Sequence, residues 1–198
     1  MAKKKIGILG DGNVGSALER GLKKAGHDVR AVGNDKAAIK ETAAWGDVVI
    51  FAVPFQAVAD AAATAGPGLD GKTVIDVTNP LDEKMGLAVG FNTSGAEELQ
   101  KKVPKARVVK AFNTVFAQHM DSGKVNGTKL TALVAGDDTE AKRTALELAG
   151  NIGFDAVDAG PLKNARLVEP LANLNIQLGY GLRMGTQQGF HLVRDGAK

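Results

Sequence analysis

The chain has 198 residues, of which 44% are hydrophobic and 24% charged, as is ordinary for a globular protein with one full domain. The absence of cysteine excludes disulfides, thiolate metal sites and cysteine nucleophiles. The net charge of +3 equals that of Lys3, Lys4 and Lys5 alone, so the remainder lacks the basic face that nucleic-acid binding requires.

No segment of the sequence has the length and apolar character of a membrane span. The longest apolar stretch, residues 48–55, contains Pro54 and falls far short of the ~20 residues that a spanning helix needs. Residues 6–9 form too short an apolar run for a secretory signal. We therefore expect a cytoplasmic protein that binds neither membrane nor nucleic acid.

The first predicted strand, residues 5–9, leads into a G-x-G-x-x-G motif made by Gly10, Gly12 and Gly15. A helix is predicted over residues 14–25, and a helix start offers unpaired N–H groups and partial positive charge to a phosphate. Gly10 allows the tight turn, Gly12 lets a pyrophosphate approach the backbone, and Gly15 lets helix and strand pack closely. The motif predicts dinucleotide binding; the alternative is a glycine-rich turn without a ligand.

The second predicted strand, residues 29–33, ends in Asn34, Asp35 and Lys36. An acid at this place pairs with the ribose 2′-hydroxyl of NAD, whereas a basic residue accommodates the 2′-phosphate of NADP. Asp35 favours NAD, while Asn34 and Lys36 could receive a phosphate. Lys36 could equally be a solvated residue at a helix start, so the nucleotide stays open.

Strand and helix patterns alternate through the following residues. Further strands are predicted at residues 47–53, 73–77, 107–112, 129–135 and 155–157. Further helices are predicted at residues 37–44, 57–63, 95–102 and 139–149. Near-continuous apolar runs such as residues 48–53 suit parallel strands covered on both faces. The pattern predicts an α/β fold with a doubly wound, Rossmann-type, mostly parallel sheet.

Ligands in such sheets bind at the carboxyl ends of the strands. The third, fourth and fifth strands end in Val53 and Pro54, in Asn79, and in Ala111, Phe112 and Asn113. The two asparagines could pair with a nicotinamide carboxamide or a ribose hydroxyl, because an amide both donates and accepts. They could also be a turn initiator and a helix N-cap, and both roles can coexist.

The sequence loses its strand pattern after residue 160. Residues 163–192 read as one or two helices, with Pro170 as a kink or a second start. We expect a dinucleotide-binding domain over residues 1–160 and a C-terminal helical segment over residues 161–198 that completes the cleft. Glycines spaced by four would share one helix face and favour close packing, within the chain or across a homodimer, or leave room for a planar cofactor; they are Gly181, Gly185 and Gly189.

No side chain is predicted to be catalytic, and no metal site is predicted. The three histidines, His27, His119 and His191, are scattered without ligand spacing.

Four segments carry a resemblance to a known family. Residues 8–15, 52–54, 134–138 and 158–169 resemble the deazaflavin-dependent NADP oxidoreductases, which pass hydride between NADP and coenzyme F-420. The nucleotide domain of the STEAP-type ferric reductases is a more distant relative. The likeness spans nearly the whole chain, and its most specific part is residues 158–169, because nucleotide binding in general does not explain it.

The resemblance implies roles for particular residues. The pyrophosphate would be cradled by Asp11, Gly12, Asn13 and Val14. Val53 and Pro54 would lie along the cofactor, and Asn79 with residues 111–113 near the nicotinamide. A deazaflavin would occupy the cleft between the sheet edge and the C-terminal helices. NADP-specific members commonly have Ser/Thr-Arg after the second strand, and this chain departs from that pattern with Gly33-Asn34-Asp35.

Our leading hypothesis is hydride transfer between NADP(H), with NAD(H) as the alternative nucleotide, and a deazaflavin or flavin such as coenzyme F-420. Two other readings stay open. One is a small-substrate reductase of the imine or β-hydroxyacid type, with Lys110 or His191 as proton donor. The other is a non-catalytic nucleotide-sensing module.

Overall fold

The computed structural model describes residues 3–195, so the outermost residues of both predicted domains lie outside it. The strands are β1 Lys5–Leu9, β2 Asp28–Val32, β3 Val48–Phe51, β4 Thr73–Asp76, β5 Arg107–Lys110, β6 Lys124–Val125, β7 Thr128–Lys129, β8 Thr131–Gly136 and β9 Asp155–Asp158. The helices are α1 Asn13–Lys24, α2 Lys36–Trp45, α3 Val58–Ala65, α4 Gly95–Lys102, α5 Thr139–Ile152 and α6 Ala165–Ile176. Short 3-10 turns cover Phe55–Ala57, Gly66–Leu69, Ala117–His119 and Leu162–Asn164, and a π-helical turn covers Gln177–Gly181.

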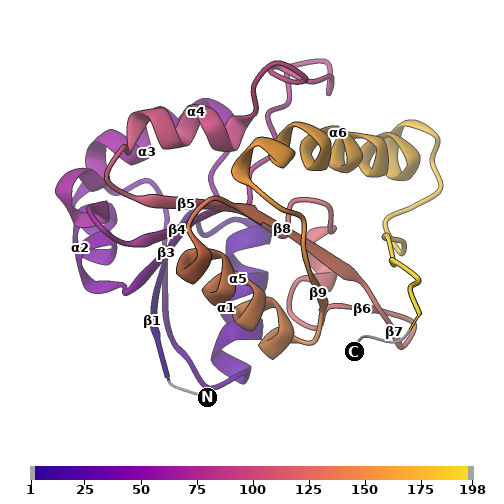
Figure 1. The fold of residues 1–198 in the computed structure, drawn as a ribbon, viewed down its shortest axis with the longest axis horizontal. Helices are drawn as coiled ribbons and strands as arrows, with labels where there is room; N and C mark the ends of the chain where they lie inside the picture. Colours follow the sequence, from indigo (N-terminus) through magenta and orange to yellow (C-terminus); the bar gives the residue numbers. More distant parts are fainter. Residues whose placement is uncertain (1–2, 196–198) are drawn as a thin grey trace.

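Seven strands form one sheet in the order β2-β1-β3-β4-β5-β8-β9 (Figure 1). The first five are parallel, β8 runs antiparallel to β5, and β9 is parallel to β8. The order reverses between β1 and β3, which is where such folds bind their ligands. The predicted doubly wound, mostly parallel sheet is confirmed.

Two apolar clusters cover the two faces of this sheet. One joins α1 and α5 to β1, β3 and β8, and the other joins α2, α3 and α4 to the opposite face. All four residues of β3 are buried, as expected of a parallel strand between two helical layers. These layers hold the carboxyl ends of β1 to β5 at one edge of the sheet.

The C-terminal part differs from the prediction. The helix expected over residues 163–192 ends with the π-helical turn at Gly181, and Pro170 lies inside α6. Arg183 and Gly185 have φ values of +56° and +83°, which a right-handed helix cannot accommodate. The tail then runs back along β8, where the Thr131 amide donates to the Phe190 carbonyl over 2.9 Å. The predicted glycine face of a helix is therefore wrong.

A small hairpin was not predicted. It consists of β6 and β7, joined through Asn126 and Gly127, which both have positive φ. An Asn-Gly pair between two short strands is the usual signal for such a turn.

His27 is a buried histidine between α1 and β2. Its Nδ1 accepts a hydrogen bond from the Lys4 amide over 3.3 Å, and its Nε2 lies 3.1 Å from the side-chain amide of Asn151. Burial, and secondly the nearby charge of Lys4, lower the pKa of His27 below its ordinary value of 6.5. The neutral ring is therefore the form that the folded protein favours.

Acid is expected to destabilise the protein through this residue. As the pH falls below about 6.5, the unfolded chain takes up a proton that the folded chain does not, so stability is lost down to the lowered pKa of the folded state. Thermal melts at pH about 7.5 and about 5.5 should differ by a few degrees. In His27→Gln the melting temperature should be lower at the higher pH and change less with acid. An identical acid response in the variant would contradict this role.

Candidate functional site

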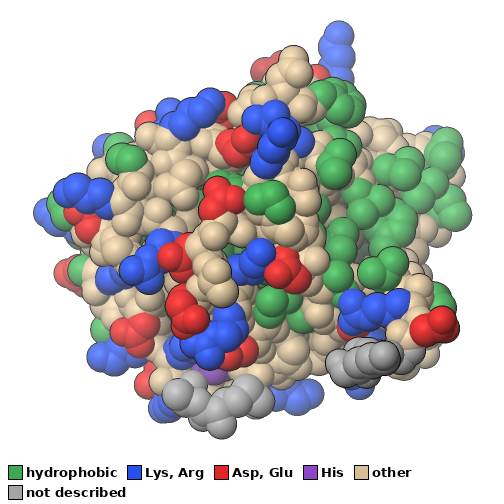
Figure 2. Space-filling view, viewed as in Figure 1, with side chains coloured by type: hydrophobic (Ala, Val, Ile, Leu, Met, Phe, Trp, Pro, Cys, Tyr) green, Lys and Arg blue, Asp and Glu red, His purple; other side chains and the backbone are tan. Residues whose placement is uncertain are grey.

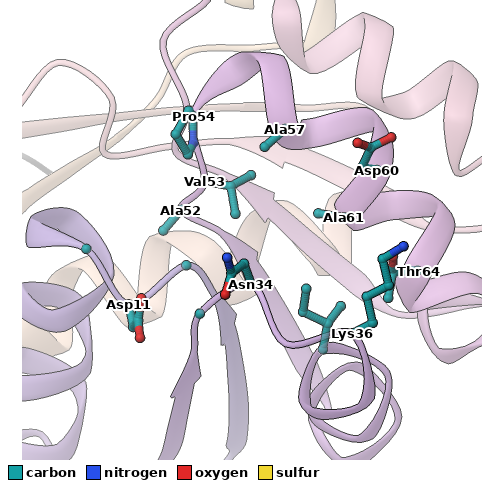
Figure 3. Close-up of a pocket in the computed structure, with 14 residues that line it drawn as sticks. Asp11, Asn34, Lys36, Ala52, Val53, Pro54, Ala57, Asp60, Ala61 and Thr64 are labelled. Atoms are coloured by element: carbon teal, nitrogen blue, oxygen red, sulfur yellow. The ribbon is translucent and has the colours of Figure 1, made fainter.

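A cavity of about 640 Å³ opens at the carboxyl ends of β1, β2 and β3 (Figure 3). Of the residues predicted to bind a cofactor, the structure places around it Gly10, Asp11, Gly12, Asn34, Lys36, Val53 and Pro54. It does not place there Asn13, Val14, Gly15, Asp35, Asn79, Ala111, Phe112 and Asn113. The cavity therefore joins the glycine loop to the ends of the second and third strands.

The glycine loop has the geometry that its motif predicts. Gly10 has φ of +111°, and a Cβ on it would lie 2.3 Å from the Ala52 carbonyl oxygen. A Cβ on Gly15 would lie 1.8 Å from the Gly10 carbonyl oxygen, so the first turn of α1 packs directly on the loop. A Cβ on Gly12 would meet nothing within 4 Å. Gly10 and Gly15 thus serve the fold, whereas Gly12 faces open space.

The start of α1 has no side-chain cap among the described residues, and its first turn contains no acid. By comparison, α2, α4 and α5 are capped by the side chains of Asp35, Ser94 and Asp138, and α3 and α6, which have no side-chain cap either, each continue a 3-10 turn. An uncapped helix start beside a cavity leaves backbone N–H groups and the positive end of the helix dipole for an anion. The open space at Gly12 fits a phosphate at this place.

At the end of β2, Asp35 caps a helix, whereas Asn34 and Lys36 line the cavity. The Asp35 carboxylate accepts a hydrogen bond from the Ala38 amide over 2.7 Å, which makes it the N-cap of α2. Asn34 and Lys36 line the cavity, and in Figure 3 Lys36 extends toward Thr64 of α3. The Asp11 carboxylate lies over Gly33, so the glycine loop brings a carboxylate to the end of β2.

Helix α3 forms the far wall of the cavity, and this contribution was not predicted from the sequence. This wall consists of Ala57, which directly precedes α3, and of Asp60, Ala61 and Thr64 within the helix (Figure 3). These residues follow the i, i+3, i+4 and i+7 spacing of one helix face. This spacing, with small side chains at three of the four positions, is the sequence pattern that could have predicted this wall.

A second group of predicted residues meets at the ends of β4 and β5. The Asn79 side-chain amide donates to the Asn113 carbonyl oxygen over 3.0 Å, and the Asn113 amide donates to the Asn79 Oδ1 over 3.1 Å. Asn113 Nδ2 also lies 3.3 Å from the Val168 carbonyl oxygen, which fixes the orientation of the amide. Asn113 Oδ1 is buried without a hydrogen-bond partner in the described structure. It is an acceptor with spare capacity.

Phe112, next to this pair, adopts a strained backbone conformation. Its φ is +64°, it is almost fully buried, and the Asn113 amide donates to the Ala111 carbonyl oxygen over 2.8 Å across it. This is a γ-turn with positive φ, which is rare for a bulky residue. Packing holds a strained turn where the fifth strand ends, as is typical of functional sites.

Helix α6 is attached beside these strand ends. Arg166 donates two hydrogen bonds to the Glu97 carboxylate. These bonds are the main reason why the pKa of Glu97 is lowered from its ordinary value. Glu169 accepts from the Gly95 and Ala96 amides at the start of α4, over 2.8 and 3.1 Å. Residues of the 158–169 segment therefore fix α6 against α4, and the two helices are neighbours along the top of Figure 1.

Neither proton donor considered for a small-substrate reductase is suitably placed. Lys110 is fully buried and its ammonium donates to Asp76, Thr78 and Glu169. His191 lies in the exposed tail, at a groove with Lys129, Asp155 and Arg194. His119, in turn, is buried, with Nε2 2.9 Å from the Thr186 carbonyl oxygen.

Within residues 3–195, no group of three or more His, Asp or Glu side chains is arranged to hold a metal ion. No helix in the same range is long and apolar enough to cross a membrane.

An exposed apolar surface covers α6 and the segment after it, at the right of Figure 2. We call it the α6 face, and it consists of Leu167, Leu174, Tyr180, Leu182 and Met184. Leu167 and Leu182 are each 70% exposed. Exposed apolar side chains gathered on one face can mark an interaction surface.

The chain is similar to several known proteins. A family model described as NADP oxidoreductase, coenzyme F420-dependent, matches residues 5–80. The F420-dependent NADP reductase of Methanocaldococcus jannaschii is 31% identical over 163 residues, which cover 79% of this chain and 71% of that protein. The rat metalloreductase STEAP3 is 32% identical over 180 residues, but they cover 84% of this chain and 36% of that protein.

A solved structure is similar over almost the whole length. It is that of a candidate F420-dependent NADP reductase from Arthrobacter sp. FB24, with a TM-score of 0.88 and 29% sequence identity. The similarity covers 96% of this chain and all of that one. The chain thus spans about a third of the metalloreductase and most or all of the two reductases.

Proposed function

The chain belongs to the family of coenzyme F420-dependent NADP oxidoreductases, and on this premise we propose that it transfers hydride between NADP(H) and coenzyme F-420. The observation that carries the proposal is the uncapped start of α1, open at Gly12, at the mouth of the cavity. It supplies the anion site that a dinucleotide pyrophosphate requires. The identity of the chemistry follows from the family.

The adenosine half of NADP is proposed to fill the cavity between the end of β2 and α3. Asn34 and Lys36 would hold the 2′-phosphate, since both line the cavity and one of them is cationic. Asp11 would accept a hydrogen bond from a ribose hydroxyl. Asn13, Val14 and Gly15 would contribute through their backbone only, while Val53 and Pro54, which line the cavity, would lie along the path of the cofactor toward β4.

The nicotinamide half is proposed to lie at the ends of β4 and β5. There the free Oδ1 of Asn113 would accept a hydrogen bond from the carboxamide N–H, in an amide pair that Asn79 completes. The buried residues Ala111 and Phe112 would form the floor beneath the ring.

When both are bound, the nicotinamide and the deazaflavin would supply the redox chemistry: hydride would pass between the nicotinamide C4 and the deazaflavin ring, and solvent would supply one proton when the deazaflavin is reduced and take one up in the reverse direction. The protein contributes alignment and exclusion of water, and no side chain needs to donate or remove a proton. Holding two rings at reacting distance can supply about 7 kcal/mol or more of the barrier reduction.

Turnover tests this proposal. Purified protein would be mixed with NADPH or NADH and with oxidised coenzyme F-420, FMN or FAD, while the absorbance of the reduced nicotinamide is followed. We expect oxidation of NADPH with coenzyme F-420 as the best acceptor. Absence of turnover with every acceptor would contradict the proposed activity and leave nucleotide sensing as the alternative.

Lys36 is expected to set the nucleotide preference. In Lys36→Ala, the ratio of NADP⁺ to NAD⁺ affinity should fall about tenfold, which corresponds to one charge-assisted hydrogen bond of about 1.4 kcal/mol. Asp35→Ala is the matched control: it should lower stability by about 1 kcal/mol through loss of the α2 cap, with the ratio unchanged. Calorimetric titration with both nucleotides measures the ratio, and an unchanged ratio in Lys36→Ala would overturn the assignment.

The cytoplasmic location and the homodimer predicted from the sequence are also part of this proposal. The dimer would form through the α6 face, since that surface is apolar and exposed. Light scattering should then give twice the chain mass, and Leu167→Glu with Leu174→Glu should give the mass of one chain. A monomeric mass for the unmodified protein would remove the homodimer.

A further inference from the structure

The buried ammonium group of Lys110 is held by three acceptors at the strand ends. Its ammonium lies 2.9 Å from Asp76 Oδ2, 2.9 Å from Glu169 Oε1 and 2.5 Å from the Thr78 carbonyl oxygen. An ammonium has three donors, so each one has an acceptor. Lys110, Asp76 and Glu169 are all buried, with exposures of 0%, 0% and 1%.

The charges of this cluster are balanced without solvent. Burial tends to lower the pKa of Lys110, but the charges and hydrogen bonds of Asp76 and Glu169 outweigh it and raise the pKa above its ordinary value. The second negative charge is compensated at the start of α4, where the Gly95 and Ala96 amides donate to Glu169. Lys110 therefore stays protonated and has no proton donor left for a substrate.

Stability alone does not explain such a cluster. Replacing buried ion pairs by apolar side chains of similar volume is often neutral or stabilising in proteins. An ammonium group with three fixed acceptors instead sets the relative position of the segments that supply those acceptors. Here those segments are the end of β4, β5 itself and α6.

The same segments carry the amide pair of the proposed nicotinamide site. Asn79 follows Thr78 in the chain, and Asn113 lies just beyond β5. The Asn113 amide also reaches the Val168 carbonyl oxygen, next to Glu169. A shift of any acceptor of Lys110 would thus be transmitted to the Asn113 amide, whose Oδ1 is buried without a hydrogen-bond partner among the described residues.

We propose that Lys110 is a positioning residue for hydride transfer: its buried ammonium fixes the ends of β4, β5 and α6 so that Asn79 and Asn113 hold the nicotinamide in reacting alignment. The proposal rests on the proposed function for its reaction. It assigns Asp76 and Glu169 to the same task, as the two carboxylates that direct the ammonium.

The test uses a neutral variant that keeps side-chain volumes, with Asp76→Asn, Lys110→Met and Glu169→Gln combined. Its affinity for 2′,5′-ADP, which can occupy only the adenosine cavity, reports whether the fold is intact. We expect that affinity to stay within about twofold of the unmodified protein, while kcat falls about tenfold or more and KM for NADPH changes little. The fluorescence of bound NADPH should also lose the enhancement that an immobilised nicotinamide gives.

A matched control removes the other ionic link between α4 and α6. Glu97→Gln with Arg166→Met deletes a half-buried ion pair that links α4 to α6 and includes no residue of β4 or β5. It should leave both kcat and NADPH fluorescence close to those of the unmodified protein. An equal loss in the control would overturn the proposal, since docking of α6 alone would then account for the effect.

Two further outcomes are decisive. If the triple variant fails to fold, Glu169→Gln alone, which leaves Lys110 paired with Asp76, should still reduce kcat several-fold, and an unchanged kcat would overturn the proposal. If the unmodified protein binds NADPH but does not reduce coenzyme F-420, the proposed reaction fails. The fluorescence comparison then still decides whether Lys110 positions the nicotinamide.

Discussion

Gly12→Val is expected to weaken NADP⁺ binding about a hundredfold while the melting temperature of the free protein stays within ~2 °C. The side chain would enter open space in the free protein, because nothing lies within 4 Å of a Cβ at Gly12. It would, however, occupy the place where the pyrophosphate must approach the start of α1. Calorimetric titration with NADP⁺ and a thermal melt measure the two effects separately.

Gly150→Ala is the control for this substitution. A Cβ at Gly150, inside α5, also meets nothing within 4 Å, but the residue lies away from the cavity. It should leave NADP⁺ affinity unchanged and raise stability slightly, because alanine favours a helix over glycine. Wild-type affinity in Gly12→Val would show that no phosphate binds at α1.

Gly10→Ala is expected to lower the free energy of unfolding by about 3 kcal/mol. The residue has φ of +111°, and its new methyl group would lie 2.3 Å from the Ala52 carbonyl oxygen, in the backbone that follows β3. Neither atom can move without separating the two neighbouring strands. Urea unfolding followed by circular dichroism measures the change.

Gly71→Ala is the control that separates the free-energy cost of a positive φ from the cost of the steric clash at Gly10. Gly71 also has positive φ, +71°, but a Cβ there meets nothing within 4 Å. It should cost about 1 kcal/mol, the ordinary penalty of a left-handed alanine. If Gly10→Ala cost no more than Gly71→Ala, the close packing of the loop on β3 would be an incorrect description.

The parallel sheet and the glycine loop could be predicted because their signals are local. A buried strand such as β3 is apolar throughout, and the loop residues are adjacent in the chain. The C-terminal tail could not be predicted in this way. Its glycines suit a helix face by spacing alone, but the tail forms long-range hydrogen bonds, for example between Phe190 and Thr131. These bonds replace the ones that a helix would have made.

Residues at the ends of strands could be predicted to lie near one another, whereas contributions that depend on how a helix packs could not. The role of Asp35 as a cap depends on α2 beginning at Lys36, and the α3 wall depends on which helix face turns toward the loop. From the sequence, Lys110 was considered only as a possible proton donor of a small-substrate reductase. Its partners, Asp76 and Glu169, lie 34 and 59 positions away in the chain, so only the fold brings them together.

Direct hydride transfer between the two rings can be followed with an isotope label. NADPH deuterated at the reactive C4 position would be oxidised by the protein with coenzyme F-420 in ordinary water, and the reduced deazaflavin analysed by mass spectrometry. We predict that the deuterium is recovered in the reduced deazaflavin. Deuterium released to the water, or no oxidation of NADPH at all, would contradict direct hydride transfer.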